Sequence, residues 1–218
     1  MPADERIAYV VDDDSAVRRS LALLLRSAGF AVQAFESGGA FLRAAVQGLP
    51  FGCVLLDLRM SGMDGLAVQR EMAARGLGLP VVVVTAHGDV PLAVQAMRAG
   101  AGDFIEKPYG DDAILRAVEA ALRRGDEERA RAREAAEAAA RVAALTPREH
   151  DVLRGLVAGR QNKVIAHDLG LSPRTVELHR ANLMEKLGVR SVSEAVRMAL
   201  VAGLGPMRPP SAGGAADG

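Results

Sequence analysis

Short apolar runs alternate with helical patterns over the first half of this chain, and that alternation restricts its fold more than any other feature. The apolar runs occupy residues 7–11, 31–35, 53–56, 81–84 and 103–105. Between them lie segments with apolar residues every three or four positions, as in 15–28. Strands that alternate with helices in this way form βαβ units. We therefore predict an α/β doubly wound, five-stranded parallel sheet.

Residues at the ends of the predicted helices agree with this assignment. Gly29 follows the first helical segment, and glycine commonly ends a helix. Pro91 suits the first turn of the fourth helix, with Asp89 as its N-cap. Asp111 and Asp112 put negative charge at the positive end of the fifth helix.

Polar residues lie at or near the ends of four of the five runs. They are Asp12 and Asp13 after the first run, Asp57 after the third, Thr85 after the fourth and Lys107 near the end of the fifth. The carboxyl ends of parallel strands in an open sheet meet in one crevice, so we expect these side chains to converge there. Carboxylates held close together repel one another. The cluster therefore indicates a function and not a gain in stability.

The types of residue in this cluster favour phosphoryl chemistry with a metal ion. The first strand is followed by VVDDDSAV and has no glycine-rich phosphate loop. Acids at that position attract Mg²⁺. With the metal bound, Asp57 could attack phosphorus as a nucleophile, while Lys107 and Thr85 bind phosphoryl oxygens. A structural Ca²⁺ site is the alternative, although it would need neither Thr85 nor Lys107.

Lysine is rare in this chain, so each lysine is a candidate for a specific role. Of the 27 basic side chains only three are lysines, at 107, 163 and 186. Lysine supplies a compact point charge where arginine supplies a planar fork. Lys107, directly before Pro108 at a strand end, is the one that we expect to act in the crevice.

These residues resemble the receiver domain of two-component response regulators over about residues 5–124. The stretches DLRM, TAHGDVP and GAGDFIEKP are similar to the FixJ type in particular. The resemblance implies a flavodoxin-like fold and a histidine kinase that phosphorylates Asp57. It also implies that Asp13, Asp57 and the Arg59 backbone carbonyl bind Mg²⁺, with Asp12 acting through water. Thr85 and Phe104 match the switch positions, and the Lys107–Pro108 bond is expected to be cis.

The sequence departs from that type at Ser61, where proline is usual, and this could loosen the loop beside Asp57. The resemblance implies no enzymatic activity beyond Mg²⁺-dependent phosphorylation and dephosphorylation of the receiver itself.

Residues 125–144 consist of strong helix formers apart from Gly125 and Asp126. We expect a helical linker that can continue the fifth helix. Heptad a/d spacing yields mostly alanine, at Ala132, Ala136, Ala139 and Ala143. A weak coiled-coil seam is one interpretation, and a solvated spacer is the favoured one.

Residues 145–204 predict a small all-α domain of four helices. Thr146, Pro147 and Glu149 form a capping-box pattern, and Ser172-Pro173 begins another helix. Residues 145–205 contain nine arginines and lysines against six acids, which favours a polyanionic partner. Periodicity alone leaves a helix-turn-helix and an ordinary four-helix satellite domain about equally supported.

The stretches LTPREHDVL, GRQNKVIAHDLGLSPRTVELHRANLMEKLGV and SVSEAVRMAL resemble the LuxR/GerE-type DNA-binding domain. The resemblance implies double-stranded DNA with two half-sites as the partner and a homodimer on phosphorylation. Lys163 and Arg180 match phosphate-contact positions, and His179 a backbone contact. The positions that face the major groove are Thr175, Glu177, Leu178 and Ala181, with Arg174 beside them. A carboxylate at Glu177 can accept from cytosine.

Bulk features place the expected protein in the cytoplasm and away from membranes. No apolar run approaches the roughly 18 residues of a membrane span, and the acidic amino terminus does not resemble a signal peptide. A single cysteine, Cys53, cannot form an internal disulfide. The tail at 205–218 is rich in glycine, proline and alanine and is expected to be disordered.

The combined hypothesis is a transcription factor controlled by phosphorylation. One rival is a phosphatase with an aspartyl nucleophile, but that class carries the nucleophile after its first strand, whereas Asp57 follows the third. The other rival is a receiver that acts as a phosphate-independent interaction module. Such a module would have no need of Asp57 together with Lys107.

Overall fold

The computed structural model describes residues 6–86 and 90–206, and it divides the chain into two compact units, Met1–Glu128 and Arg129–Gly218. The predicted cap Asp89 and the predicted disordered tail beyond residue 206 lie outside the described residues.

The first unit contains a five-stranded, fully parallel sheet, as predicted. Its strands are β1 (Ile7–Val11), β2 (Ala31–Phe35), β3 (Cys53–Leu56), β4 (Val81–Thr85) and β5 (Ala101–Glu106), in the order β2-β1-β3-β4-β5. The chain runs from β1 outward to β2 and then returns to the other side of β1. That reversal opens a crevice at the carboxyl ends of β1 and β3.

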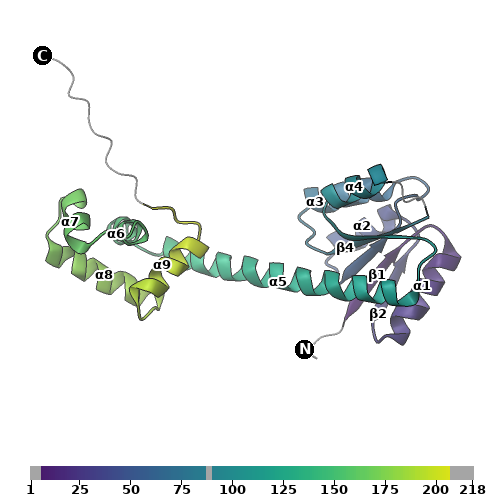
Figure 1. The fold of residues 1–218 in the computed structure, drawn as a ribbon, viewed down its shortest axis with the longest axis horizontal. Helices are drawn as coiled ribbons and strands as arrows, with labels where there is room; N and C mark the ends of the chain where they lie inside the picture. The colour runs from purple at the N-terminus through teal and green to yellow at the C-terminus, as the bar shows by residue number, and fades with distance from the viewer. Residues whose placement is uncertain (1–5, 87–89, 207–218) are drawn as a thin grey trace, which may run out of the picture. The chain divides into compact units, whose positions relative to one another are not determined.

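Helices cover both faces of this sheet (Figure 1). They are α1 (Ser15–Ser27), α2 (Gly38–Val46), α3 (Gly65–Ala74), α4 (Val90–Arg98) and the first part of α5 (Asp111–Ala143). Residues of α2, α3 and α4 pack with Tyr9 and Val11 in one core. Residues of α1 and α5 pack with Ala8 and Val10 in the other. Because successive strand residues face opposite sides, a strand covered on both faces reads as one continuous apolar run.

Short polar residues begin the helices near the crevice. Asp14 caps α1 by accepting from the Ala16 amide at 2.7 Å, and Asp64 caps α3 by accepting from the Ala67 amide at 2.6 Å. Gly29, which follows α1, has a φ of +83° and so ends the helix as predicted. The Lys107–Pro108 peptide bond is cis, also as predicted.

Helix α5 continues without interruption through the predicted linker. The alanines at heptad positions, such as Ala132 and Ala136, are exposed. Ala138 and Val142 are instead buried within the second unit, at 5% and 6% exposure. The expectation of a solvated spacer is therefore wrong for the last turns of α5, because an apolar stripe with helical rather than heptad spacing packs there.

The second unit consists of the end of α5 and four further helices around one core. They are α6 (Pro147–Val157), α7 (Asn162–Leu169), α8 (Pro173–Leu187) and α9 (Val192–Val201). The predicted capping box at Thr146 and Glu149 is present, and Ser172 caps α8. Gly170, with a φ of +65°, turns the chain between α7 and α8, which form the predicted helix-turn-helix. Within residues 6–86 and 90–206, every helix is too short or too polar to cross a membrane.

Candidate functional site

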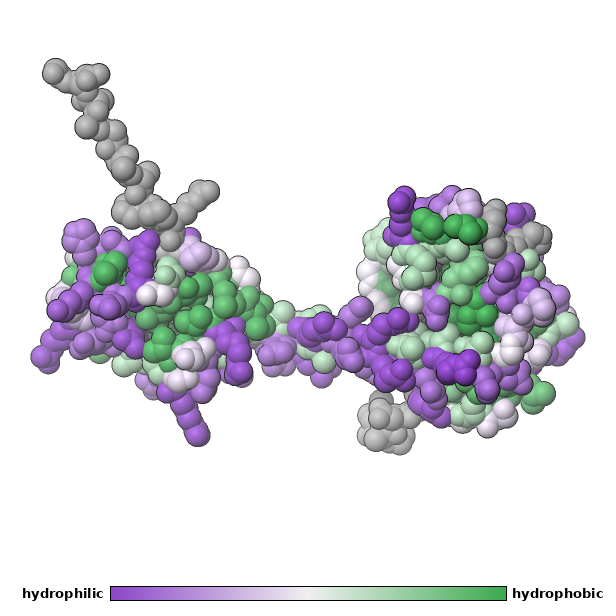
Figure 2. All heavy atoms as spheres, viewed as in Figure 1, coloured by the Kyte–Doolittle hydropathy of each residue, from purple (hydrophilic) through white to green (hydrophobic). Residues whose placement is uncertain are grey.

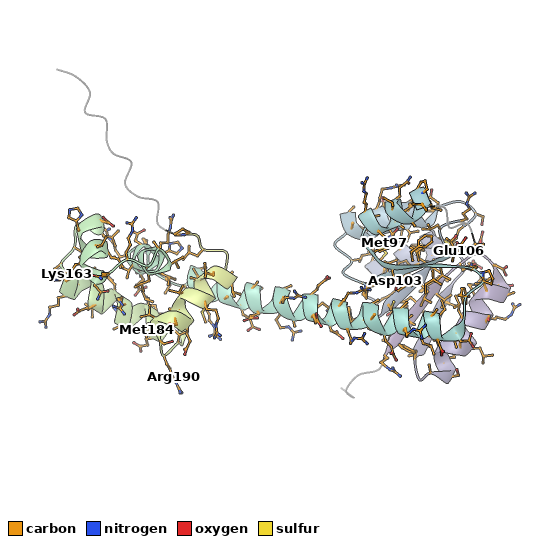
Figure 3. The ribbon with its side chains drawn as sticks, in the orientation of Figure 1. Met97, Asp103, Glu106, Lys163, Met184 and Arg190 are labelled. Carbon is orange, nitrogen blue, oxygen red and sulfur yellow. The ribbon has the colours of Figure 1, made fainter. Side chains whose placement is uncertain are left out.

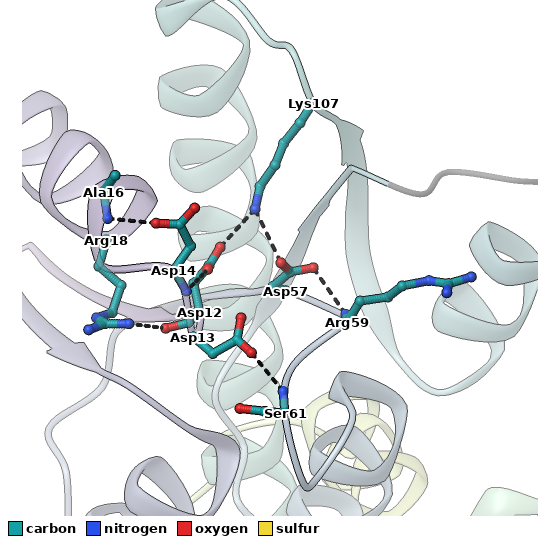
Figure 4. Close-up of polar contacts among 9 residues, drawn as sticks. All are labelled: Asp12, Asp13, Asp14, Ala16, Arg18, Asp57, Arg59, Ser61 and Lys107. Atoms are coloured by element: carbon teal, nitrogen blue, oxygen red, sulfur yellow. Dashed lines mark hydrogen bonds and ion pairs between the residues drawn. The ribbon is translucent and has the colours of Figure 1, made fainter.

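Three carboxylates converge at the crevice that the sheet order predicts (Figure 4). Asp12 and Asp13 follow β1, and Asp57 follows β3. Each can offer one oxygen atom such that the three atoms lie within 4.8 Å of one another. Asp12 and Asp57 are buried, whereas Asp13 is exposed at the rim.

Lys107 reaches into this acid cluster from the end of β5 (Figure 4). Its Nζ donates to Asp12 Oδ2 at 2.7 Å and to Asp57 Oδ2 at 3.2 Å. Its side chain is 16% exposed, so the ammonium is partly withdrawn from water. One positive charge thus serves two buried carboxylates.

Backbone amides bind each carboxylate as well. Asp12 Oδ1 accepts from the Asp14 amide at 2.8 Å, and Asp57 Oδ1 accepts from the Arg59 amide at 3.1 Å. Asp13 Oδ2 accepts from the Ser61 amide at 2.7 Å. These bonds fix the loops after β1 and β3 relative to each other. These bonds could not be predicted from the sequence, because every residue except proline carries a backbone amide.

The ionisation of these groups follows from burial and from their partners. Burial raises the pKa of Asp12, although the hydrogen bond from Lys107 opposes that rise. The Ser61 amide holds the pKa of Asp13 below its usual value. Burial disfavours the charged form of Lys107, but its bonds to Asp12 and Asp57 outweigh that effect and raise its pKa. Lys107 therefore remains a cation.

Thr85 and Phe104 lie on the two strands at the far side of the crevice. Thr85 ends β4 and is fully buried, and its carbonyl accepts from the Lys107 amide at 2.9 Å. Phe104 on β5 is half-buried and packs against the core that contains α4 residues. The structure therefore brings Thr85 next to the cluster through Lys107 and places Phe104 on the neighbouring strand, beside Val83.

The donor set of this crevice suits a hard divalent cation. Three carboxylate oxygens in one place are ligands of the kind that Mg²⁺ prefers. The Arg59 side chain points away from the cluster and is exposed (Figure 4). Arg18, which the sequence did not single out, donates from Nη1 to the Asp12 carbonyl at 2.7 Å and anchors the loop after β1.

The second candidate surface lies on α8. Four of its predicted DNA-facing residues are exposed and share one helical face, namely Arg174, Glu177, Leu178 and Ala181. Leu178 is 60% exposed and so is free to contact a partner. Lys163 projects from α7 and is exposed (Figure 3). His179 is half-buried.

Two other predicted DNA contacts are engaged within the unit. Arg180 Nη1 donates to Asn162 Oδ1 at 2.7 Å and so joins α8 to the start of α7. The Thr175 hydroxyl lies 2.8 Å from the hydroxyl of Ser172, the cap of α8. Arg180 thus joins the two helices of the helix-turn-helix, whereas Thr175 contacts only the cap of its own helix.

Two family models match this chain, one for each unit. The family model described as the response regulator receiver domain matches residues 8–119, and the one described as bacterial regulatory proteins, luxR family, matches residues 143–199.

Whole-chain relatives combine the same two parts. The transcriptional regulatory protein FixJ of Azorhizobium caulinodans is 52% identical over 91% of this chain and 93% of its own length. FixJ of Bradyrhizobium diazoefficiens is 49% identical over 90% of this chain and 95% of its own. The structure of the response regulator StyR has a TM-score of 0.73 at 41% identity, covering 90% of this chain and 99% of that one. The crystal structure of full-length FixJ from B. japonicum has a TM-score of 0.58 at 48% identity. The match covers 93% of this chain and 99% of that one.

Proposed function

Because this chain belongs to the response regulators that join a receiver domain to a LuxR-type DNA-binding domain, we propose that Asp57 is the residue through which it is controlled. A histidine kinase phosphorylates Asp57, and the phosphorylated protein binds DNA more tightly through α8. The observation that carries this proposal is the position of Asp57 itself. It is the buried carboxylate of the cluster that follows β3 and contacts Lys107.

The chemistry requires a nucleophile, neutralisation of charge and a leaving group. An Asp57 carboxylate oxygen forms a bond to phosphorus as the phosphorus–nitrogen bond of the kinase phosphohistidine breaks, and the electron pair returns to the imidazole nitrogen. Lys107, 3.2 Å from Asp57, would neutralise a phosphoryl oxygen. Thr85 would hydrogen-bond another. Such transfer depends mostly on positioning and electrostatics.

Mg²⁺ is the cofactor that we infer for this step. Asp13, Asp57 and the Arg59 carbonyl would bind it, and Asp12 would act through water. Bound there, the ion would supply positive charge to the phosphoryl oxygens. The sharing of one ammonium supports this inference, since Lys107 bonds to both Asp12 and Asp57.

Phosphorylation would be passed on through Thr85 and Phe104 to the surface of α4. Apolar side chains gather over α4 (Figure 2), where Val90, Val94 and Met97 are 76%, 43% and 47% exposed. Ala101, at the start of β5, is 6% exposed and belongs to the core instead. We infer that Val90, Val94 and Met97 form the face through which two phosphorylated receivers pair.

The DNA partner in this proposal is a duplex with two half-sites. Arg174, Glu177, Leu178 and Ala181 would face the major groove, with Thr175 beside them. Lys163, His179 and Arg180 would contact the phosphate backbone.

The receiver would span residues 5–124, the linker 125–144 and the DNA-binding domain 145–204. A DNA target and a kinase partner would make the cytoplasm the place of action.

Labelling with acetyl phosphate tests the assignment of Asp57. We expect Mg²⁺-dependent modification at Asp57, detected by mass spectrometry after borohydride trapping. Asp57→Asn should abolish the label, and Asp13→Ala should weaken metal binding and labelling together. Asp64→Asn is the matched control, because Asp64 is an exposed acid in the same loop that only caps α3. Undiminished labelling of Asp57→Asn would refute the assignment.

A further inference from the structure

Two sets of polar contacts join the carboxyl end of α8 to the point where the linker enters the second unit. In the last turn of α5, Arg141 Nη1 donates to the Leu187 carbonyl at 3.2 Å. One residue earlier on α8, Lys186 Nζ pairs with Glu149 Oε2 at 2.8 Å. The same Glu149 oxygen accepts from the Thr146 amide at 2.8 Å. We call these five residues the junction clamp.

Glu149 is the centre of the junction clamp. It is 3% exposed, and a buried carboxylate is costly unless it is paired and hydrogen-bonded. Its partners come from two places, the residues directly after the linker and the end of α8. Burial opposes its ionisation, but the bonds from Lys186 and Thr146 outweigh burial and hold its pKa below the usual value. Glu149 is therefore one anion that residues of both segments contact.

The contact from Arg141 satisfies a different need. The last carbonyls of a helix lack partners within the helix and carry partial negative charge. The Arg141 guanidinium binds one of them, at Leu187. A Cβ added at Gly188, the next residue, would lie 3.7 Å from Arg141 Nη1, so the guanidinium lies directly against the end of α8. Val142 and Leu187 share the same buried core, which packs these two segments together.

We propose that the junction clamp makes the end of α5 and the DNA-reading helix α8 move as one piece, and that Arg141 and Lys186 are the positioning residues that carry the phosphorylation signal to α8. The inference rests on the proposed function, in which α8 reads DNA. The clamp holds the carboxyl end of α8, while the exposed residues Arg174, Glu177, Leu178 and Ala181 lie nearer its amino end than the clamp does. The orientation of those residues therefore follows the linker.

The test uses the full chain and a duplex that wild-type, beryllofluoride-loaded protein selects from a random pool. DNA affinity is measured with and without beryllofluoride and Mg²⁺, and the ratio of the two affinities is the readout. Allosteric couplings typically change an affinity by about 5- to 150-fold. We expect Arg141→Gln and Lys186→Met each to reduce the ratio by about threefold or more. Lys186→Arg, which keeps the charge, should restore most of it.

Matched controls separate coupling from simple stability. Arg148→Gln removes a basic residue of α6 whose contact with Asp151 is exposed and 3.9 Å long, and it should leave the ratio unchanged. Val152→Ala should lower thermal stability through the core without changing the ratio. Clamp variants that weaken both affinities by the same factor would show that the clamp is only structural and would overturn the proposal.

The hydrogen-exchange rates of the backbone amides in the last turn of α8 show, without DNA, whether the junction clamp stabilises that turn. We expect faster exchange there in Arg141→Gln than in Arg148→Gln, and equal rates would overturn the proposal. Since Arg141 is exposed, this variant should fold even where Lys186→Met does not. Wild-type protein that selects no duplex would count against the proposed function, and the exchange rates would still decide whether the clamp exists.

Discussion

Asp12 and Glu149 are both buried carboxylates with a lysine at hydrogen-bond distance, yet their pKa values shift in opposite directions. Burial dominates at Asp12 and raises its pKa. At Glu149 the bonds from Lys186 and Thr146 prevail over burial and lower it. Desolvation exceeds the opposing bonds from Lys107 and the Asp14 amide at Asp12, and the neighbouring Asp57 carboxylate raises the pKa of Asp12 further. Lys107 also binds Asp57, whereas Lys186 contacts Glu149 alone among the contacts described. The receiver crevice is thus short of positive charge, as a site for a divalent cation would be.

Because the pKa of Glu149 is lowered in the folded protein, the free energy of unfolding should depend on pH in the acid range. A carboxyl group whose pKa is lower in the folded state stabilises the fold above its unfolded value of about 4.5, and that contribution is lost as pH falls through the folded value. We expect Glu149→Gln to cost about 1.5–3 kcal/mol at pH 7, the usual loss for a hydrogen bond to a charged group. The deficit relative to wild type should shrink below pH 4.5.

Denaturant unfolding of the full chain at several pH values measures this difference. Glu185→Gln is a suitable control, because Glu185 lies on the same helix as Lys186 and is exposed. A deficit for Glu149→Gln that stays constant from pH 7 to pH 3 would contradict the assignment of the effect to the ionised carboxylate.

At the scale of elements, the start of α3 fixes the loop that carries Asp57. Gly65 is buried, and its amide donates to the Leu58 carbonyl at 2.9 Å. A Cβ at this position would lie 2.3 Å from the Asp57 carbonyl oxygen and 2.8 Å from Leu58 Cα. Both atoms belong to the backbone, so no side-chain rotation can relieve the overlap. Helix α3 can approach the loop that carries Asp57 this closely only with glycine at position 65.

Gly65→Ala should therefore move Asp57 and slow its labelling by acetyl phosphate several-fold. The overlap should also destabilise the receiver by about 1–3 kcal/mol. Gly39→Ala is the matched control in α2, since its Cβ would meet only the flexible end of Arg43 at 3.5 Å. That variant should be neutral or up to about 1 kcal/mol more stable. Equal labelling rates for the two variants, measured under the same conditions, would refute this role of Gly65.

The helices and strands could be predicted from the sequence where the local hydrophobic pattern matches the packing in the fold. Strand ends located Asp12, Asp57 and Lys107 correctly, because the sheet order forces those ends into one crevice. The bonds from Arg18 and Ser61 could not be predicted, since they depend on how two loops meet. The burial of Glu149 was missed for a similar reason. Its capping role is local, but its pairing with Lys186 joins residues 37 positions apart.

Helix α5 shows the same limit. Its helix-forming composition predicted one long helix, and it is one. Composition could not show that Ala138 and Val142 are buried within the second unit, because burial there depends on residues distant in the sequence. Gly125, which reads as a weak point in a helix, is buried against Phe51, where a Cβ would lie 2.8 Å from the ring. Tertiary packing thus explains a residue that local propensity disfavours.

For the whole molecule, we expect the exposed apolar face of α4 to link phosphorylation of the receiver to the affinity for DNA. Val90, Val94 and Met97 would be covered if two phosphorylated receivers paired. Pairing would raise the effective concentration of the second DNA-binding domain at a site with two half-sites, so affinity would rise without any new contact to DNA. Beryllofluoride should therefore tighten self-association and DNA binding together, and Thr85→Ala should lose both while still accepting the label.

Val94→Asp tests the pairing face directly, because a charge there would have to be buried on association. We expect the beryllofluoride-loaded variant to remain monomeric in sedimentation and to bind a two-half-site duplex at least tenfold more weakly than wild type. Leu23→Asp on α1 is the control, since Leu23 is 72% exposed and lies away from α4 on the opposite face of the sheet. Wild-type protein that stays monomeric when loaded, at concentrations that saturate the duplex, would exclude pairing as the mechanism. The DNA-binding unit would then have to be activated by release from an inhibiting contact within one chain.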